Sequence, residues 1–115
     1  MNPPSSCGNK GLMADHPLQQ LQCWFDAHCN GAWEHHQGIT IKTTDNPGWW
    51  VKIALHDTEL ANRSFTTVAE NVDPNGLQLG PRWLMCRLQN GHWHGAGDER
   101  RLEQILSIFL SWAAT

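Results

Sequence analysis

Histidine, cysteine and acidic side chains, the groups that bind zinc or catalyse hydrolysis, gather between residues 29 and 50 and again near residue 93. Cys23 and Cys29 are six positions apart, wider than the gap of about two to four residues in zinc-binding pairs, and no second Cys pair follows. His92 and His94 would share one face of a strand, but no third ligand can be assigned. The spacing therefore predicts structural or surface histidines and no metal or other cofactor.

Two other constellations in this segment could carry chemistry. Cys29 and His35 could form a nucleophile and its base, but Cys29 is expected at the C-terminal end of a helix, where the dipole disfavours a thiolate. Glu34 and Asp45 could act as an acid and a base, although Asp45 is also typical of a residue that caps its own turn. Glu34 could equally accept a backbone hydrogen bond or bind a partner. We expect no enzyme; the alternative is a small metal-dependent or Cys/His hydrolase.

The aromatic residues are seven Trp and three Phe, with no Tyr. Trp49 and Trp50 are neighbours in a predicted strand, so one ring should face the core and the other should face away. Tryptophans exposed among polar residues are typical of protein-protein hot spots, and a Trp-lined pocket for a small ligand is the alternative. These residues could also simply lock the hairpin to the first helix. The candidate partner-binding residues are Trp33, Glu34, His35, Asp45, Asn46 and Trp49.

Helical spacing at both ends of the chain predicts the elements that flank these residues. Leu18, Leu21 and His28 recur on one face, which predicts a helix from Pro17 to about Cys29. Near the C-terminus, Asp98 can cap a second helix. The apolar residues of that helix are Leu102, Ile105, Leu106, Phe109 and Trp112.

Alternating apolar and polar residues predict strands between the two helices. Residues 39–44 and 49–55 should form a hairpin around the turn at 45–48. A third strand could begin near Phe65, and residues 82–88 and 92–94 should pair across a tight turn, after which Gly95 and Gly97 should end the sheet. We therefore expect an α+β fold, in which an N-terminal and a C-terminal helix cover an antiparallel sheet of about four to five strands.

The bulk composition narrows the choice of partner and location. The chain has 115 residues and a formal charge of −3, which disfavours binding to nucleic acid because phosphate backbones require a clustered basic face. No apolar run approaches the ~20 residues that span a bilayer, and no signal peptide is visible, so we expect a cytosolic protein without a membrane partner. Its cysteines should then be reduced, with Cys23 and Cys86 packed as small hydrophobic residues. Residues 1–14 should form a flexible tail, and residues 15–115 a single domain.

Several short motifs carry a resemblance to a known family. In order, they are Leu21-Gln22-x-Trp24, Cys29-Asn30-Gly31-x-Trp33-Glu34-His35, Gly38-Ile39-x-Ile41, Thr44-Asp45-Asn46-Pro47-Gly48-Trp49 and Leu102-x-x-Ile105-Leu106-x-x-Phe109-x-x-Trp112. This order resembles the bacterial family called immunity protein 53, over about residues 18–113. The resemblance implies a cytosolic immunity protein of a polymorphic toxin system, whose partner is a cognate bacterial toxin domain. It implies neutralisation by occlusion, without turnover.

Overall fold

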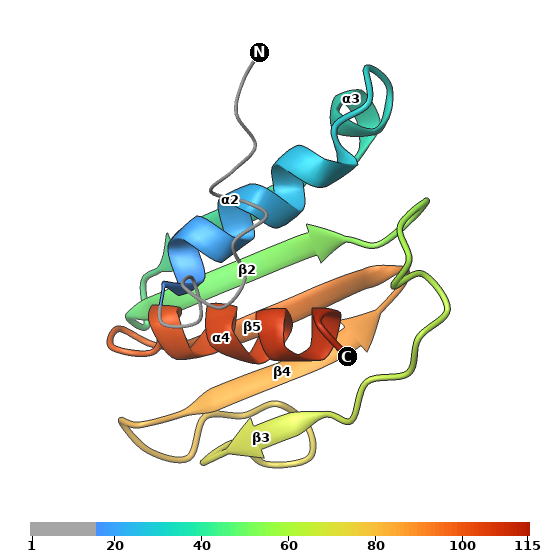
Figure 1. Ribbon diagram of the computed structural model, residues 1–115. Coiled ribbons are helices and arrows are strands. Elements are labelled where there is room, and N and C mark those ends of the chain that lie inside the picture. The colour runs from blue at the N-terminus through green and yellow to red at the C-terminus, as the bar shows by residue number, and fades with distance from the viewer. Residues whose placement is uncertain (1–15) are drawn as a thin grey trace.

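The computed structural model describes residues 16–115, which form a five-stranded antiparallel sheet with helices on one side (Figure 1). The strand order is β1-β2-β5-β4-β3, and every neighbouring pair is antiparallel. The elements are α2 (Pro17–His28), α3 (Trp33–His36), β1 (Ile39–Thr44), β2 (Gly48–Ala54), β3 (Val68–Glu70), β4 (Leu84–Gln89), β5 (His92–Asp98) and α4 (Leu102–Ala113). The predicted α+β fold is confirmed. The tail predicted over residues 1–14 lies outside the described residues.

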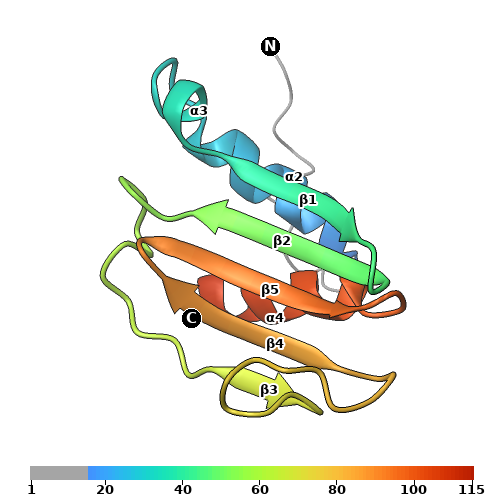
Figure 2. The ribbon, with the colours of Figure 1, turned by 180° about the vertical axis from the view of Figure 1, so that it is seen from behind.

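The helices α2 and α4 lie side by side on one face of the sheet, and no helix formed by residues 16–115 covers the other face (Figures 1 and 2). The core fills the space between α4 and the central strands. Its fully buried members include Val51 and Ile53 of β2, Trp93 of β5, and Ile105 and Phe109 of α4. Alternation along each strand places these side chains on the helix-covered face and their neighbours on the uncovered one.

Strand β5 does not end at its glycines, so the prediction that Gly95 and Gly97 break the sheet is wrong. The strand continues through both residues to Asp98. A Cβ atom added at Gly95 would lie 2.4 Å from Cγ2 of Ile105 and 2.8 Å from the ring of Trp93. The glycines leave room for α4 to approach the sheet closely, which explains why they lie within a strand.

Asp98 does not cap α4 as predicted, because that helix begins only after Arg101, and its capping position makes no side-chain hydrogen bond. The buried Asp98 carboxylate instead accepts backbone hydrogen bonds from Trp83 at 3.1 Å and Arg100 at 2.9 Å, and pairs with Arg82 at 3.0 Å. Burial raises the pKa of Asp98, but these backbone donors and the Arg82 charge outweigh burial and lower it overall. Asp98 therefore ties the start of β4 to the end of β5.

The prediction for Cys23 also needs correction. Cys23 is half-buried on α2 and disulfide-bonded, so it is not the packed, reduced thiol that was predicted. A sulfur at the edge of the core can reach a second cysteine, whereas Cys86 is fully buried and keeps a free thiol, as Cys29 does. The stretch between α2 and β1, where no element was expected, contains the single helical turn of α3.

Candidate partner-binding surfaces

Trp33 lies inside the fold at the end of the molecule where α3 meets α2. Its side chain is only 5% exposed and packs against Trp24 and His28, with ring centroids 6.0 Å and 5.7 Å away. Its indole N–H donates to the carbonyl oxygen of His56 at 2.8 Å. Trp33 thus joins α2 to the segment that follows β2.

Glu34 is engaged in a reciprocal cap around the start of α3. Its carboxylate accepts the backbone N–H groups of Asn30 at 2.9 Å and Gly31 at 2.8 Å, and the Asn30 side chain accepts the N–H of Trp33 at 2.9 Å. Hydrogen bonds from its own amide, and then from Asn30 and Gly31, lower the pKa of Glu34 despite partial desolvation. The neighbouring His35 is exposed. This part of the predicted site is therefore one polar cap with one exposed imidazole beside it.

The other predicted residues lie at the turn between β1 and β2. Asp45 and Asn46 are exposed, and the Asn46 amide donates to the side-chain oxygen of Gln78 at 2.8 Å. Trp49 is half-buried against the core, and its indole N–H donates to the carbonyl oxygen of Glu99 at 3.1 Å. This second group connects the hairpin to two distant segments of the chain.

The two groups lie at opposite ends of β1, with α3 at one end and the β1–β2 turn at the other (Figure 2). Six strand residues span roughly 17 Å at the usual rise of about 3.4 Å per residue. Glu34 and Asp45 therefore do not meet as an acid-base pair. The six residues form no single patch, and their contact with a partner stays a prediction.

Cys29 is poorly placed to act as a nucleophile. It follows the last residue of α2, and burial, together with the charges of Glu34 and Asp26, raises the pKa of its thiol. Within residues 16–115, no three or more His, Cys, Asp or Glu side chains converge as a metal site would require. None of the helices described is long and apolar enough to cross a bilayer.

The uncovered side of the sheet, here called the open face, carries the tryptophan that faces away from the core. That ring belongs to Trp50, not to Trp49, which confirms that the two neighbours point to opposite faces. The ammonium groups of Lys42 and Lys52 lie 4.8 Å and 6.0 Å from the centroid of the Trp50 ring, and the His94 ring is 5.9 Å away. The Trp50 ring therefore packs against three basic side chains and attracts the two ammonium groups through cation–π interactions.

A row of basic residues crosses the open face on three adjacent strands. Lys52 of β2 pairs in register with His94 of β5, which pairs with Arg87 of β4. Burial lowers the pKa of His94 below its ordinary value, and the charges of His92, Lys52 and Arg87 lower it further. His94 therefore favours its neutral form, and Lys52 and Arg87 carry the positive charge of the row.

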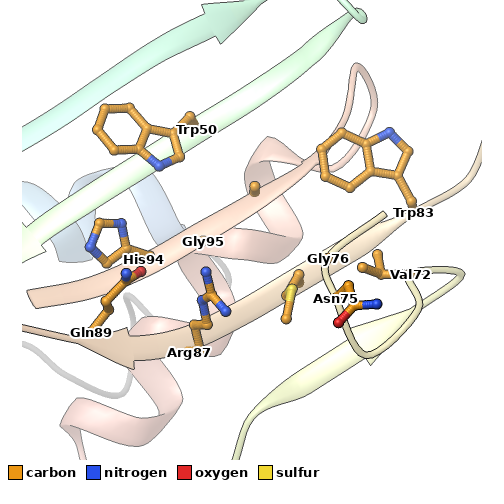
Figure 3. A pocket seen from close by; sticks show the side chains of 11 residues that line it. Trp50, Val72, Asn75, Gly76, Trp83, Arg87, Gln89, His94 and Gly95 are labelled. Atoms are coloured by element: carbon orange, nitrogen blue, oxygen red, sulfur yellow. The ribbon is translucent and has the colours of Figure 1, made fainter. Parts of the chain in front are cut away.

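A hollow of about 410 Å³ opens on this face between the strands and the loop at residues 71–79. Trp50, His94 and Arg87 project from three strands toward it, and Val72 and Asn75 border it from the loop (Figure 3). The loop is folded on itself. Val72 pairs with Gln78 in an isolated bridge, and the Asp73 carboxylate accepts the N–H groups of Asn75 and Leu77 at 2.9 Å and 2.8 Å.

Sequence reasoning missed the open face, although part of the signal was available. The alternation of residues 49–55 puts Trp50 and Lys52 on one side, and the pair His92 and His94 was expected to share a face, as it does. Strand pairing was needed to join these positions to Arg87, because β4 and β2 are separated by about thirty residues of sequence.

The immunity protein 53 family model matches residues 18–114, which include α4, the entire sheet and all of α2 except Pro17. The chain belongs to this family. Searches of curated proteins and of solved structures found no match. Family membership gives the chain an immunity role in which the partner is a toxin protein.

Proposed function

We propose that this protein binds a cognate toxin of a bacterial polymorphic toxin system in the cytoplasm and blocks it by occlusion, without turnover. The observation that carries the proposal is the family match over residues 18–114. Occlusion requires only that a folded surface cover the active site or the substrate path of the toxin. No cofactor is needed for that task.

The loops of the structure suit a preformed binding surface. The turn at Asn30 and Glu34 and the loop at Asp73 are both held by hydrogen bonds from side chain to backbone within a few residues. A loop that is ordered before binding loses less conformational entropy on association, and this lowers the free-energy cost of forming the complex. The chain thus offers shaped surfaces that need little rearrangement.

The six residues predicted from the sequence enter this proposal as two separate contact regions. His35 is the exposed member near α3, and Asp45 and Asn46 are the exposed members at the β1–β2 turn. The other three, Trp33, Glu34 and Trp49, form hydrogen bonds with backbone groups and so hold the exposed residues in position. A toxin would use one region or reach along the hairpin to both.

Co-expression with the toxin domain encoded beside this gene tests the proposal. We expect cells that carry both genes to grow and cells that carry the toxin alone to stop growing. Arrest despite soluble, folded immunity protein would contradict the proposed function.

Titration of the purified toxin domain tests the mode of action. A binder without turnover should abolish toxin activity only when the two proteins are equimolar, whereas an enzyme that modifies the toxin would suffice in substoichiometric amounts. Size-exclusion chromatography should show a stable complex. Neutralisation by a small fraction of an equivalent would reject occlusion in favour of catalysis.

A further inference from the structure

The open face differs in charge from the rest of this acidic chain. Its strand positions include Lys42, Lys52 and Arg87, and none of these three cations forms an ion pair with a carboxylate among the described residues. Along the strands, the one acidic residue on this side is Asp98, which is buried and paired with Arg82. The chain as a whole has a formal charge of −3, and the carboxylate of Asp73, in the loop beside the hollow, accepts hydrogen bonds from the backbone N–H groups of Asn75 and Leu77.

Exposed apolar side chains lie next to this basic surface. Leu77 and Leu79 of the loop that borders the hollow are 64% and 62% exposed, although that loop is held by its own hydrogen bonds. Two leucines on an ordered loop beside a Trp-containing hollow have the composition of an interface centre. A surface that combines these unpaired cations with exposed apolar side chains is complementary to a partner that supplies both carboxylates and an apolar side chain.

We propose that the open face is a further docking surface, beside the two contact regions described above, and that it binds an acidic surface of the toxin. Toxin carboxylates would lie along the row of Lys52, His94 and Arg87, and an apolar toxin side chain would enter the hollow beside Trp50. The inference rests on the proposed function, which supplies a toxin protein as the partner. A protein fits better than a nucleic acid because the exposed leucines Leu77 and Leu79 match an apolar side chain of the partner, which a phosphate backbone does not offer.

Charge reversal on and off the open face tests this placement. Arg87 and Arg100 are both exposed, and neither forms an ion pair with a described carboxylate, but Arg100 lies in the connection between β5 and α4. We expect Arg87→Glu to weaken binding of the neighbouring gene's toxin domain roughly 100-fold, because an attractive contact becomes a repulsive one. Arg100→Glu changes the net charge equally and should bind as the wild type does.

A matched pair of leucine variants tests the apolar part of the surface. Leu77→Ala with Leu79→Ala should weaken toxin binding by roughly 10-fold or more. Leu18→Ala is the control, since Leu18 is 62% exposed on α2, on the helix-covered side. Circular dichroism should show that every variant remains folded.

The outcomes separate the two proposals. Equal affinities of the Arg87→Glu and Arg100→Glu variants, beside a wild type that binds the toxin, would overturn the docking surface and leave the proposed function intact. A wild type that neither binds nor protects would overturn both. Tight binding of a single-stranded RNA oligonucleotide, lost in Arg87→Glu, would overturn the protein occupant. Recovery of Arg87→Glu by a carboxylate-to-lysine change in the toxin would support the contact directly.

Discussion

The two faces of the sheet use the same strands for opposite purposes. Trp93 is fully buried on the helix-covered face, where its ring centroid lies 5.2 Å from that of Phe109. Trp50, on the adjacent strand, turns its ring to the open face beneath two lysine ammonium groups. The apolar burial that stabilises the domain is therefore concentrated on one side, which leaves the other side free to display charge and aromatic surface.

The largest expected effect comes from replacing the tryptophan on each face in turn and comparing the two losses in the free energy of unfolding. Trp93→Ala should lower the free energy of unfolding by about 4 kcal/mol, because it leaves a large cavity under α4. Trp50→Ala should lower it by no more than about 1 kcal/mol, since the ring lies outside the core and its contacts are with Lys42, Lys52 and His94. Urea unfolding measures both values. Similar losses for the two variants would contradict the division of labour between the faces.

Asp98 provides the next largest expected effect, because it is a buried charge at the end of the central strand β5. Asp98→Asn should cost about 3 kcal/mol at neutral pH by leaving Arg82 without its buried partner. The folded-state pKa of Asp98 is lowered, so its stabilisation is present above the unfolded pKa of about 3.9 and is lost as pH falls through the folded pKa. Thermal unfolding from neutral to acid pH should show the deficit of the variant shrinking.

An exposed aspartate is the control for this pH experiment. Asp57→Asn changes a side chain that is 75% exposed, at a positive φ of 63° that asparagine also adopts. It should leave the stability nearly unchanged at every pH. A deficit of Asp98→Asn that stays constant down to low pH would contradict the assigned role of its carboxylate.

A substitution at Glu34 tests whether this residue stabilises the fold or contacts the toxin. Glu34→Ala should lower the stability of the domain, because it removes the acceptor for the backbone N–H groups of Asn30 and Gly31. His35→Ala, at the exposed neighbour, should cost little stability and serves as the comparison. If Glu34→Ala loses toxin binding while its unfolding free energy is unchanged, the capping role is wrong and the carboxylate acts at the interface.

The smallest expected effect concerns the titration of His94 on the open face. Burial and the charges of His92, Lys52 and Arg87 lower its pKa, so its neutral form contributes stability that is lost as pH falls from about 6.5 through the folded pKa. Arg87→Gln removes one of these charges and should raise the pKa of His94, as measured by NMR titration. Lys42→Gln, on the more distant β1, should change it less.

Short-range sequence patterns correctly predicted the helices, hairpins and turns that depend on neighbouring residues. The helical spacing of Leu18, Leu21 and His28 indicated α2, and the alternation of residues 39–44 and 49–55 indicated the first hairpin. The turn at Asn90 and Gly91 also formed as predicted, with φ values of 52° and 78°. Each of these features depends on side chains within a few residues of one another, so the linear order carries the required information.

The candidate site depended on distances that linear order does not contain. Trp33 and Trp49 are close in sequence, on either side of β1. In space they lie at opposite ends of that six-residue strand, so their surroundings do not meet. Gly95 resembles a strand breaker by local preference, and the close approach of Ile105 from α4 gives the physical reason for its presence.

The sequence by itself determined the two long helices, the hairpins, the α+β class and, through its motifs, the family. Only the tertiary structure decided which tryptophan faces outward and which cations meet. Lys52, His94 and Arg87 belong to three strands, and they share one row because antiparallel hydrogen bonding sets the register across the sheet. Such pairing is a long-range property, since it forms only when the whole sheet closes over its core.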